Sequence, residues 1–127
     1  MRETNVATSC QLIRMADHVV MLAELELATT FWRRFKGLQL RRQLPAEAGL
    51  LLAPCSSLHT CFMRFAIDVI MLDRGGTVLQ VRRGVRPWRV VLCSSDTRAV
   101  IETAPFVLDV QVGDRLAWVS RPEARQC

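Results

Sequence analysis

The sequence predicts a mainly β fold, a mostly antiparallel β-sandwich or barrel that carries one or two helices. Short segments of apolar and β-favouring residues recur from residue 49 to residue 120. Glycine, proline, serine and aspartate form turn signals between several of these segments. The best helix candidate is the stretch of residues 29–42. One helix followed by many short strands is typical of a sandwich or barrel with a helix on it.

The first part of the chain, CQLIRMADHVVMLAELELA (residues 10–28), predicts two short strands around a turn at residues 16–18. A helix is an alternative for residues 19–28, because alanine, leucine and glutamate favour it. The helix expected over residues 29–42 begins at a capping threonine and has apolar side chains at i, i+4 and i+7 on one face. Pro45 closes this element.

The rest of the chain predicts strands. LDRGGTV (residues 72–78) is the clearest hairpin, since two glycines stand at its centre. Further turn signals are Pro54, Arg86-Pro87, residues 94–96 and Gly113-Asp114. The predicted strand segments are GLLLAP (49–54), SLHTCFM (57–63), AIDVIMLD (66–73), TVLQVRR (77–83), RAVIETA (98–104) and RLAWVS (115–120).

Length and composition indicate a single intracellular domain. The 127 residues suit one domain, with polar, flexible tails at about 1–8 and 121–127. Five cysteines at wide spacing fit reduced thiols in a cytoplasm, and no apolar run approaches the ~20 residues of a membrane helix. The net charge of +5 suits an anionic partner. Nucleic-acid binding is disfavoured, because the basic residues are scattered and no reading motif accompanies them.

A possible catalytic pair is His59 and Asp68. If segments 57–63 and 66–73 pair around a tight turn at Met63-Arg64, His59 lies opposite Asp68 with Cβ atoms about 5 Å apart. The aspartate would then orient the ring and raise its basicity. The alternatives are a structural histidine, and an aspartate that caps backbone N–H groups or pairs with Arg64, because a buried carboxylate needs partners.

Other motifs are weaker. Cys55, His59 and Cys61 do not match the usual zinc spacings, and neither a phosphate loop nor a nucleophile elbow is present, so we expect no metal and no cofactor. Trp88 stands in RPWRV, beside a proline and between two arginines. It can line a pocket, stack on a flat or sugar ligand, or pack in the core.

These residues carry a resemblance to the small bacterial and archaeal family known as domain of unknown function 192, over about residues 28–118. Gln39 replaces the family's usual methionine, and Pro105 stands where a glycine is usual. The resemblance implies a compact, jelly-roll-like β-sandwich or barrel with a helix packed on it, and it implies no activity. The matching positions are Arg34, Gly37, Leu38, Arg41, Leu44, residues 49–52, His59, Met63, Arg64, residues 67–70, Leu72, Asp73, residues 87–89, Ile101, Glu102, Thr103, Gly113 and Asp114.

Three functions follow from these observations. The favoured one is a module that binds a small polar, anionic or carbohydrate-like ligand in a cleft. Its expected ligand-binding residues are His59, Met63, Arg64, Asp68 and Trp88. The alternatives are a protein-interaction or regulatory domain that uses Arg34 and Arg41 on the predicted helix, and a hydrolase-like enzyme with His59 as the base. The sequence does not determine the oligomeric state.

Overall fold

The computed structural model describes residues 9–28, 44–53, 57–59 and 65–120, and these residues form a mainly β fold, as predicted. This part of the chain contains no helix; the helix expected over residues 29–42 and both predicted tails lie outside it. It also contains no helix long and apolar enough to cross a membrane. The strands are β1 (Ser9–Arg14), β2 (Val20–Ala28), β3 (Ala48–Leu52), β4 (Ser57–His59), β5 (Ile67–Leu72), β6 (Val78–Val85), β7 (Val90–Leu92), β8 (Ala99–Thr103) and β9 (Leu116–Ser120).

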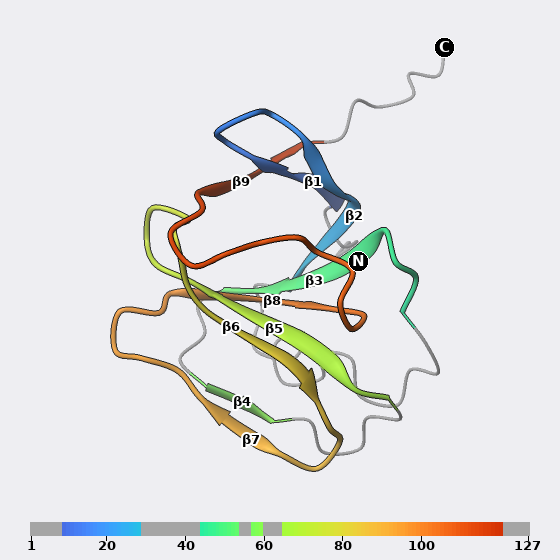
Figure 1. The fold of residues 1–127 in the computed structure, drawn as a ribbon, viewed down its shortest axis with the longest axis vertical. Coiled ribbons are helices and arrows are strands. Elements are labelled where there is room, and N and C mark those ends of the chain that lie inside the picture. The colour runs from blue at the N-terminus through green and yellow to red at the C-terminus, as the bar shows by residue number, and fades with distance from the viewer. Residues whose placement is uncertain (1–8, 29–43, 54–56, 60–64, 121–127) are drawn as a thin grey trace, which may run out of the picture.

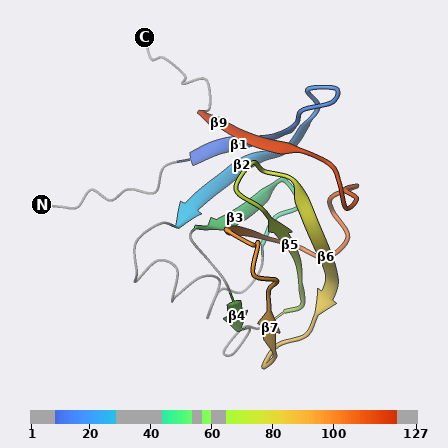
Figure 2. The same ribbon diagram turned by 90° about the vertical axis from the view of Figure 1, so that its left-hand side faces the viewer.

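Seven strands form one curled sheet in the order β6-β5-β8-β3-β2-β1-β9, and β4 pairs with β7 in a small second sheet. The large sheet bends into a half-barrel, with the β4–β7 pair below it in both views (Figures 1 and 2). The two edge strands approach each other at one end. There Thr77 bridges to Arg115, and the amide of Leu116 donates to the carbonyl of Gly76 at 2.9 Å.

The sequence predicted a mostly antiparallel sandwich or barrel; the large sheet is mixed and forms a half-barrel, so the sandwich is not confirmed. Strands β2 and β3 run parallel, with Glu24 opposite Ala48 and Ala28 opposite Leu52, whereas the other pairs are antiparallel. Parallel neighbours need a crossover of a dozen or more residues. The long connection over residues 29–47 provides that length.

The predicted hairpin at the two glycines is confirmed as the β5–β6 connection. Asp73 Oδ1 accepts hydrogen bonds from the amides of Gly75 and Thr77, both at 2.9 Å. Gly76 has φ 87°, and a Cβ atom there would lie 2.3 Å from the carbonyl oxygen of Leu116. Only glycine therefore fits at this position, where the turn meets the start of β9.

Strand β5 is buried on both faces and separates two apolar clusters. Ile70 and Leu72 belong to a first cluster, which also takes side chains from β1, β2, β9 and the segment before β9. Val69 and Met71 point the other way, into a second cluster that includes Val91 of β7. A polar side chain on β5 is therefore removed from water whichever way it points.

Candidate functional site

Asp68 is the second residue of this buried strand and is 0 % exposed. It faces a β-bulge on β6: Ile67 pairs with Val85 and Val69 with Arg82, so that Arg83 and Gly84 together oppose Asp68. Gly84 has φ 62°, a left-handed conformation that favours glycine. The bulge directs the Gly84 amide at the aspartate, to which it donates.

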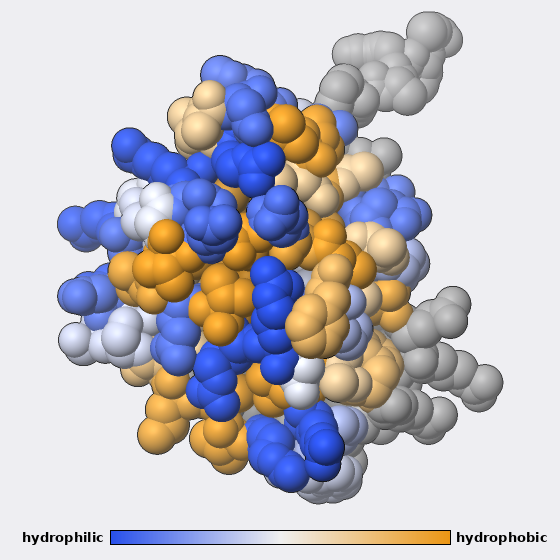
Figure 3. Space-filling model, viewed as in Figure 1, coloured by the Kyte–Doolittle hydropathy of each residue, from blue (hydrophilic) through white to orange (hydrophobic). Residues whose placement is uncertain are grey.

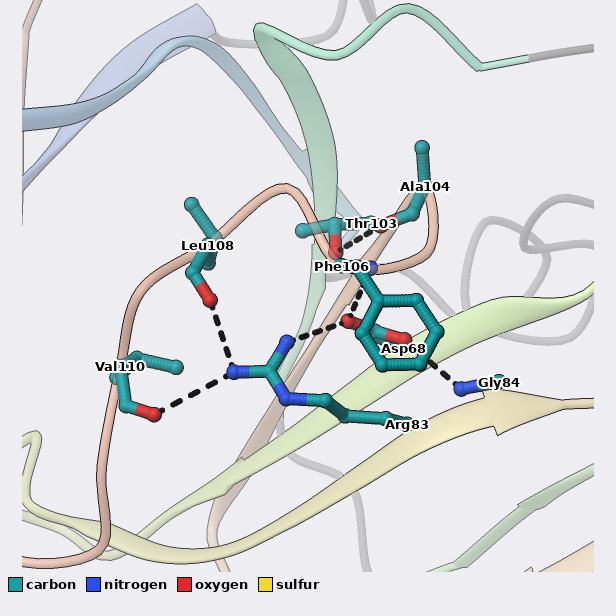
Figure 4. A network of polar contacts seen from close by, with 8 residues as sticks. All are labelled: Asp68, Arg83, Gly84, Thr103, Ala104, Phe106, Leu108 and Val110. Carbon is teal, nitrogen blue, oxygen red and sulfur yellow. Dashed lines mark hydrogen bonds and ion pairs between the residues drawn. The ribbon is translucent and has the colours of Figure 1, made fainter.

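Three donors satisfy the Asp68 carboxylate (Figure 4). The Gly84 amide donates to Oδ1 at 2.8 Å. The Arg83 guanidinium and the Phe106 amide both donate to Oδ2 at 2.7 Å. A buried carboxylate is costly unless it is paired and hydrogen-bonded, and Asp68 meets both conditions. These contacts show that Asp68 caps backbone N–H groups, which is one of the alternatives drawn from the sequence.

Arg83 extends the network to the segment between β8 and β9. Its Nη2 donates to the carbonyl of Leu108 at 2.8 Å, and its guanidinium lies 5.7 Å from the centroid of the Phe106 ring. Leu108 and Val110 are buried in the first cluster. In Figure 4 the Arg83 guanidinium lies between the Asp68 carboxylate and the carbonyls of Leu108 and Val110. The Asp68–Arg83 pair therefore fixes this segment against β5 and β6.

The predicted pairing of His59 with Asp68 is wrong. His59 lies in β4 opposite Val90 of β7, whereas Asp68 lies opposite Thr103 of β8. The physical reason is the connection between the two segments, because Met63-Arg64 lacks the residues that a tight hairpin turn requires. A hydrolase mechanism that depends on this strand pair loses its geometric basis.

The structure places only some of the remaining predicted ligand-binding residues. The register puts His59 opposite Val90, two positions after Trp88. Met63 and Arg64 lie outside the described residues. They precede Phe65, which packs against the second cluster together with Val91. The β4 strand, the start of β5 and the β6–β7 connection therefore share one neighbourhood.

Two exposed aromatic side chains border the end of β6. Trp88 is 58 % exposed and Phe106 is 70 % exposed, and their φ angles of 65° and 59° are left-handed. A bulky residue in this conformation costs about 1–2 kcal/mol, and such strain clusters at functional sites. An ideal Cβ at Gly84 would lie 3.9 Å from the Phe106 ring, so this ring lies beside the bulge.

Each of the two rings has arginine neighbours, in sequence for Trp88 and in space for Phe106. Arg86 and Arg89 are exposed on either side of Trp88, and Arg83 lies against Phe106. Residues 74–95 contain five arginines and no aspartate or glutamate, and Arg83 has the buried Asp68 as its counter-charge. We call Arg86, Trp88, Arg89 and Phe106 the arginine–aromatic surface.

Sequence reasoning assigned no functional role to Arg83, Phe106 or Glu102. The double arginine followed by glycine within VLQVRRGV was a usable signal for the bulge, because glycine inside a strand often marks one. Phe106 had no such signal. Glu102 is a second buried carboxylate, at 3 % exposure, and its cross-strand neighbours are Leu50 and Val69.

The described residues offer neither a metal site nor an activated thiol. Across residues 9–28, 44–53, 57–59 and 65–120, no group of three His, Cys, Asp or Glu residues could hold a metal ion. Burial raises the pKa of the Cys93 thiol, which packs against the second cluster. A raised pKa lowers the thiolate fraction on which nucleophilic attack depends.

Comparison with known proteins identifies relatives along most of the chain. Residues 12–118 match the family model DUF192, described as "Uncharacterized ACR". A UPF0127 protein of Thermococcus sibiricus is 33% identical over 118 residues, covering 84% of this chain and 73% of its own. Another from Pyrococcus abyssi is also 33% identical over 118 residues, covering 86% of this chain and 97% of its own.

Two solved structures share the fold. A protein of unknown function from Novosphingobium aromaticivorans has a TM-score of 0.74 at 21% identity, covering 87% of this chain and 84% of its own. A Sinorhizobium meliloti protein, proposed to be a transcription regulator, has a TM-score of 0.77 at 20% identity, covering 93% and 98%. At this identity the likeness concerns the fold alone.

Proposed function

Since the chain belongs to the uncharacterised DUF192 (UPF0127) family, we propose a function from its geometry: it binds a small anionic ligand on the arginine–aromatic surface. The ligand class is a sugar acid or a sugar phosphate. The observation that carries the proposal is the exposure of two aromatic side chains, Trp88 and Phe106, in the segments that follow β6 and β8. Both rings are large and exposed, and both are held in left-handed backbone.

The chemistry of this surface suits such a ligand. An aromatic face can stack on the apolar face of a sugar ring while its edge stays in water. A guanidinium group matches a carboxylate or a phosphate, and two parallel N–H donors hold it in a fixed direction. Arg86 and Arg89 flank Trp88 in sequence, so that stacking and charge recognition lie within one short connection.

Asp68 enters the proposal as a positioning residue. Its Oδ2 accepts the amide of Phe106 at 2.7 Å, and Arg83 holds the following residues through the carbonyl of Leu108. The Phe106 backbone is thereby fixed before any ligand arrives, which lowers the ordering cost of binding. His59, Met63 and Arg64 remain proposed ligand contacts: His59 lies opposite Val90 of β7, and Met63 and Arg64 shortly precede β5 in sequence.

Binding is tested by calorimetry and thermal shift with three probes: D-glucuronate, D-glucose 6-phosphate and neutral D-glucose. We expect the two anions to bind and glucose to leave the protein unchanged. Trp88→Ala and Arg86→Gln should each weaken anion binding by about tenfold or more, equivalent to about 1.4 kcal/mol. The control is Arg74→Gln, since Arg74 is an exposed arginine in the β5–β6 turn at the opposite end of β6.

Two outcomes would overturn the proposal. One is that neither anion binds the wild-type protein. The other is that Arg74→Gln weakens binding as much as Arg86→Gln does, which would mean that general positive charge, and not this surface, attracts the anion.

A further inference from the structure

Strand β7 exposes apolar side chains in an alternating pattern. Val90 is 67% exposed and Leu92 is 74% exposed, whereas Val91 between them is 1% exposed and packs into the second cluster. The outer face of this strand is thus apolar where a solvent-facing strand normally carries polar residues. Figure 3 shows apolar atoms at the lower left of the molecule, where Figure 1 places β7.

The same strand is an edge strand in the part of the chain that the structure describes. Among the residues that the structure describes, β7 forms strand pairs with β4 alone, through Ser57–His59. An edge strand presents backbone N–H and C=O groups that can pair with another chain, and soluble proteins usually protect such edges with charges, prolines or bulges. Within β7 itself none of these devices is present.

The positive charge beside β7 favours an acidic partner. Arg82, Arg86 and Arg89 are exposed on β6 and the β6–β7 connection, and no acidic residue occurs from 74 to 95. Strongly hydrophilic atoms adjoin the apolar ones at the lower edge of Figure 3. A second copy of this chain would bring like charges together, at a net charge of +5 each. An acidic chain would instead be attracted by the positive charge of these arginines.

We propose that β7 is a docking strand for an extended acidic segment of a partner protein, which adds a third strand to the β4–β7 sheet. Backbone pairing would supply affinity, and alternate apolar side chains of the partner would cover Val90 and Leu92. Acidic residues at the end of the segment would face Arg89. This role goes beyond binding of a small anion, because its occupant is a polypeptide and its contact surface is the outer face of β7.

The test uses two synthetic peptides that share an alternating Val-Thr core, one flanked by glutamates and the other by lysines. NMR titration of the full chain measures affinity, and amide hydrogen exchange locates the contact. We expect the glutamate peptide to bind more tightly and to slow exchange at β7, with an affinity that falls as salt rises. In Val90→Thr/Leu92→Thr, which keeps β-favouring residues, binding should weaken by about tenfold through the lost apolar contact.

Three results would overturn the docking proposal: no effect of either peptide on β7, equal binding of the lysine peptide, or concentration-dependent self-association that the double variant abolishes. The last result would mean that β7 pairs with itself. D-Glucuronate binding by Val90→Thr/Leu92→Thr keeps the two proposals apart, because we expect this variant to bind the sugar acid as the wild type does.

Discussion

Asp68→Asn tests the structural role of the buried carboxylate. Asparagine has nearly the same shape, but it has one acceptor oxygen in place of two and no charge. If its oxygen takes the place of Oδ2, it keeps the bonds from Arg83 and Phe106. Its NH₂ group then faces the amide of Gly84, which donated to Oδ1 at 2.8 Å. The substitution therefore leaves a donor facing a donor and an arginine without its counter-charge.

The magnitude follows from these two losses. A buried donor without an acceptor costs about 1–3 kcal/mol. Loss of one partner of a buried ion pair costs about 3–5 kcal/mol, and the lower end applies because the Arg83 side chain is 29% exposed and keeps some hydration. The two losses share the same carboxylate and do not add in full. We expect unfolding free energy to fall by about 3 kcal/mol.

Urea and thermal unfolding measure this loss. With a slope of about 2 kcal/mol/M, the urea midpoint should fall by about 1.5 M at an unchanged slope. The melting temperature should fall by about 10 °C. Asp96→Asn is the matched control, because Asp96 is exposed, and its change should stay within about 0.5 kcal/mol. A loss below about 1 kcal/mol in Asp68→Asn would refute the structural role.

Two further predictions concern packing and burial. Gly113→Ala should cost about 1 kcal/mol, since Gly113 has φ 99° but open space around it. Gly76→Ala should cost clearly more in the same urea titration, because its Cβ would also meet the Leu116 carbonyl oxygen at 2.3 Å. Burial raises the thiol pKa of Cys10 and Cys93. With the other three cysteines replaced by serine, both thiols should react with iodoacetamide near neutral pH more slowly than the urea-unfolded chain does; equal rates would contradict this prediction.

Local signals in the sequence were sufficient for much of the fold. The β5–β6 hairpin could be predicted because Asp73 and Gly76 lie within the turn that they form. The two strands around residues 16–18 and most later strands also followed from local composition and turns. Strand β7 was missed, since three residues with two exposed apolar side chains give no burial pattern to detect.

Long-range pairing could not be predicted in the same way. The parallel contact of β2 with β3 depends on how residues 29–47 return the chain. The pairing of β4 with β7 joins segments separated by two other strands. Short-range spacing favoured β5 as the partner of β4, and chain proximity alone does not decide between such partners.

The same distinction between local signals and long-range contacts applies to the candidate site. Asp68 could be selected because a carboxylate between Ile67 and Val69 must find partners. Its partners could not be named, because Arg83 lies 15 residues away and Phe106 lies 38 residues away. Trp88 was singled out by its arginine and proline neighbours, but its left-handed backbone required coordinates.

The most direct measurement of the proposed function is a ¹H–¹⁵N correlation map of the labelled protein titrated with D-glucuronate. We expect saturable shifts confined to residues 84–89 and 105–107, together with the side-chain indole signal of Trp88. The indole of Trp118, a partly buried residue on β9, should stay in place and serves as an internal control. Shifts centred elsewhere, or no saturable shift in the β6–β7 connection, would contradict the assignment of ligand binding to the arginine–aromatic surface.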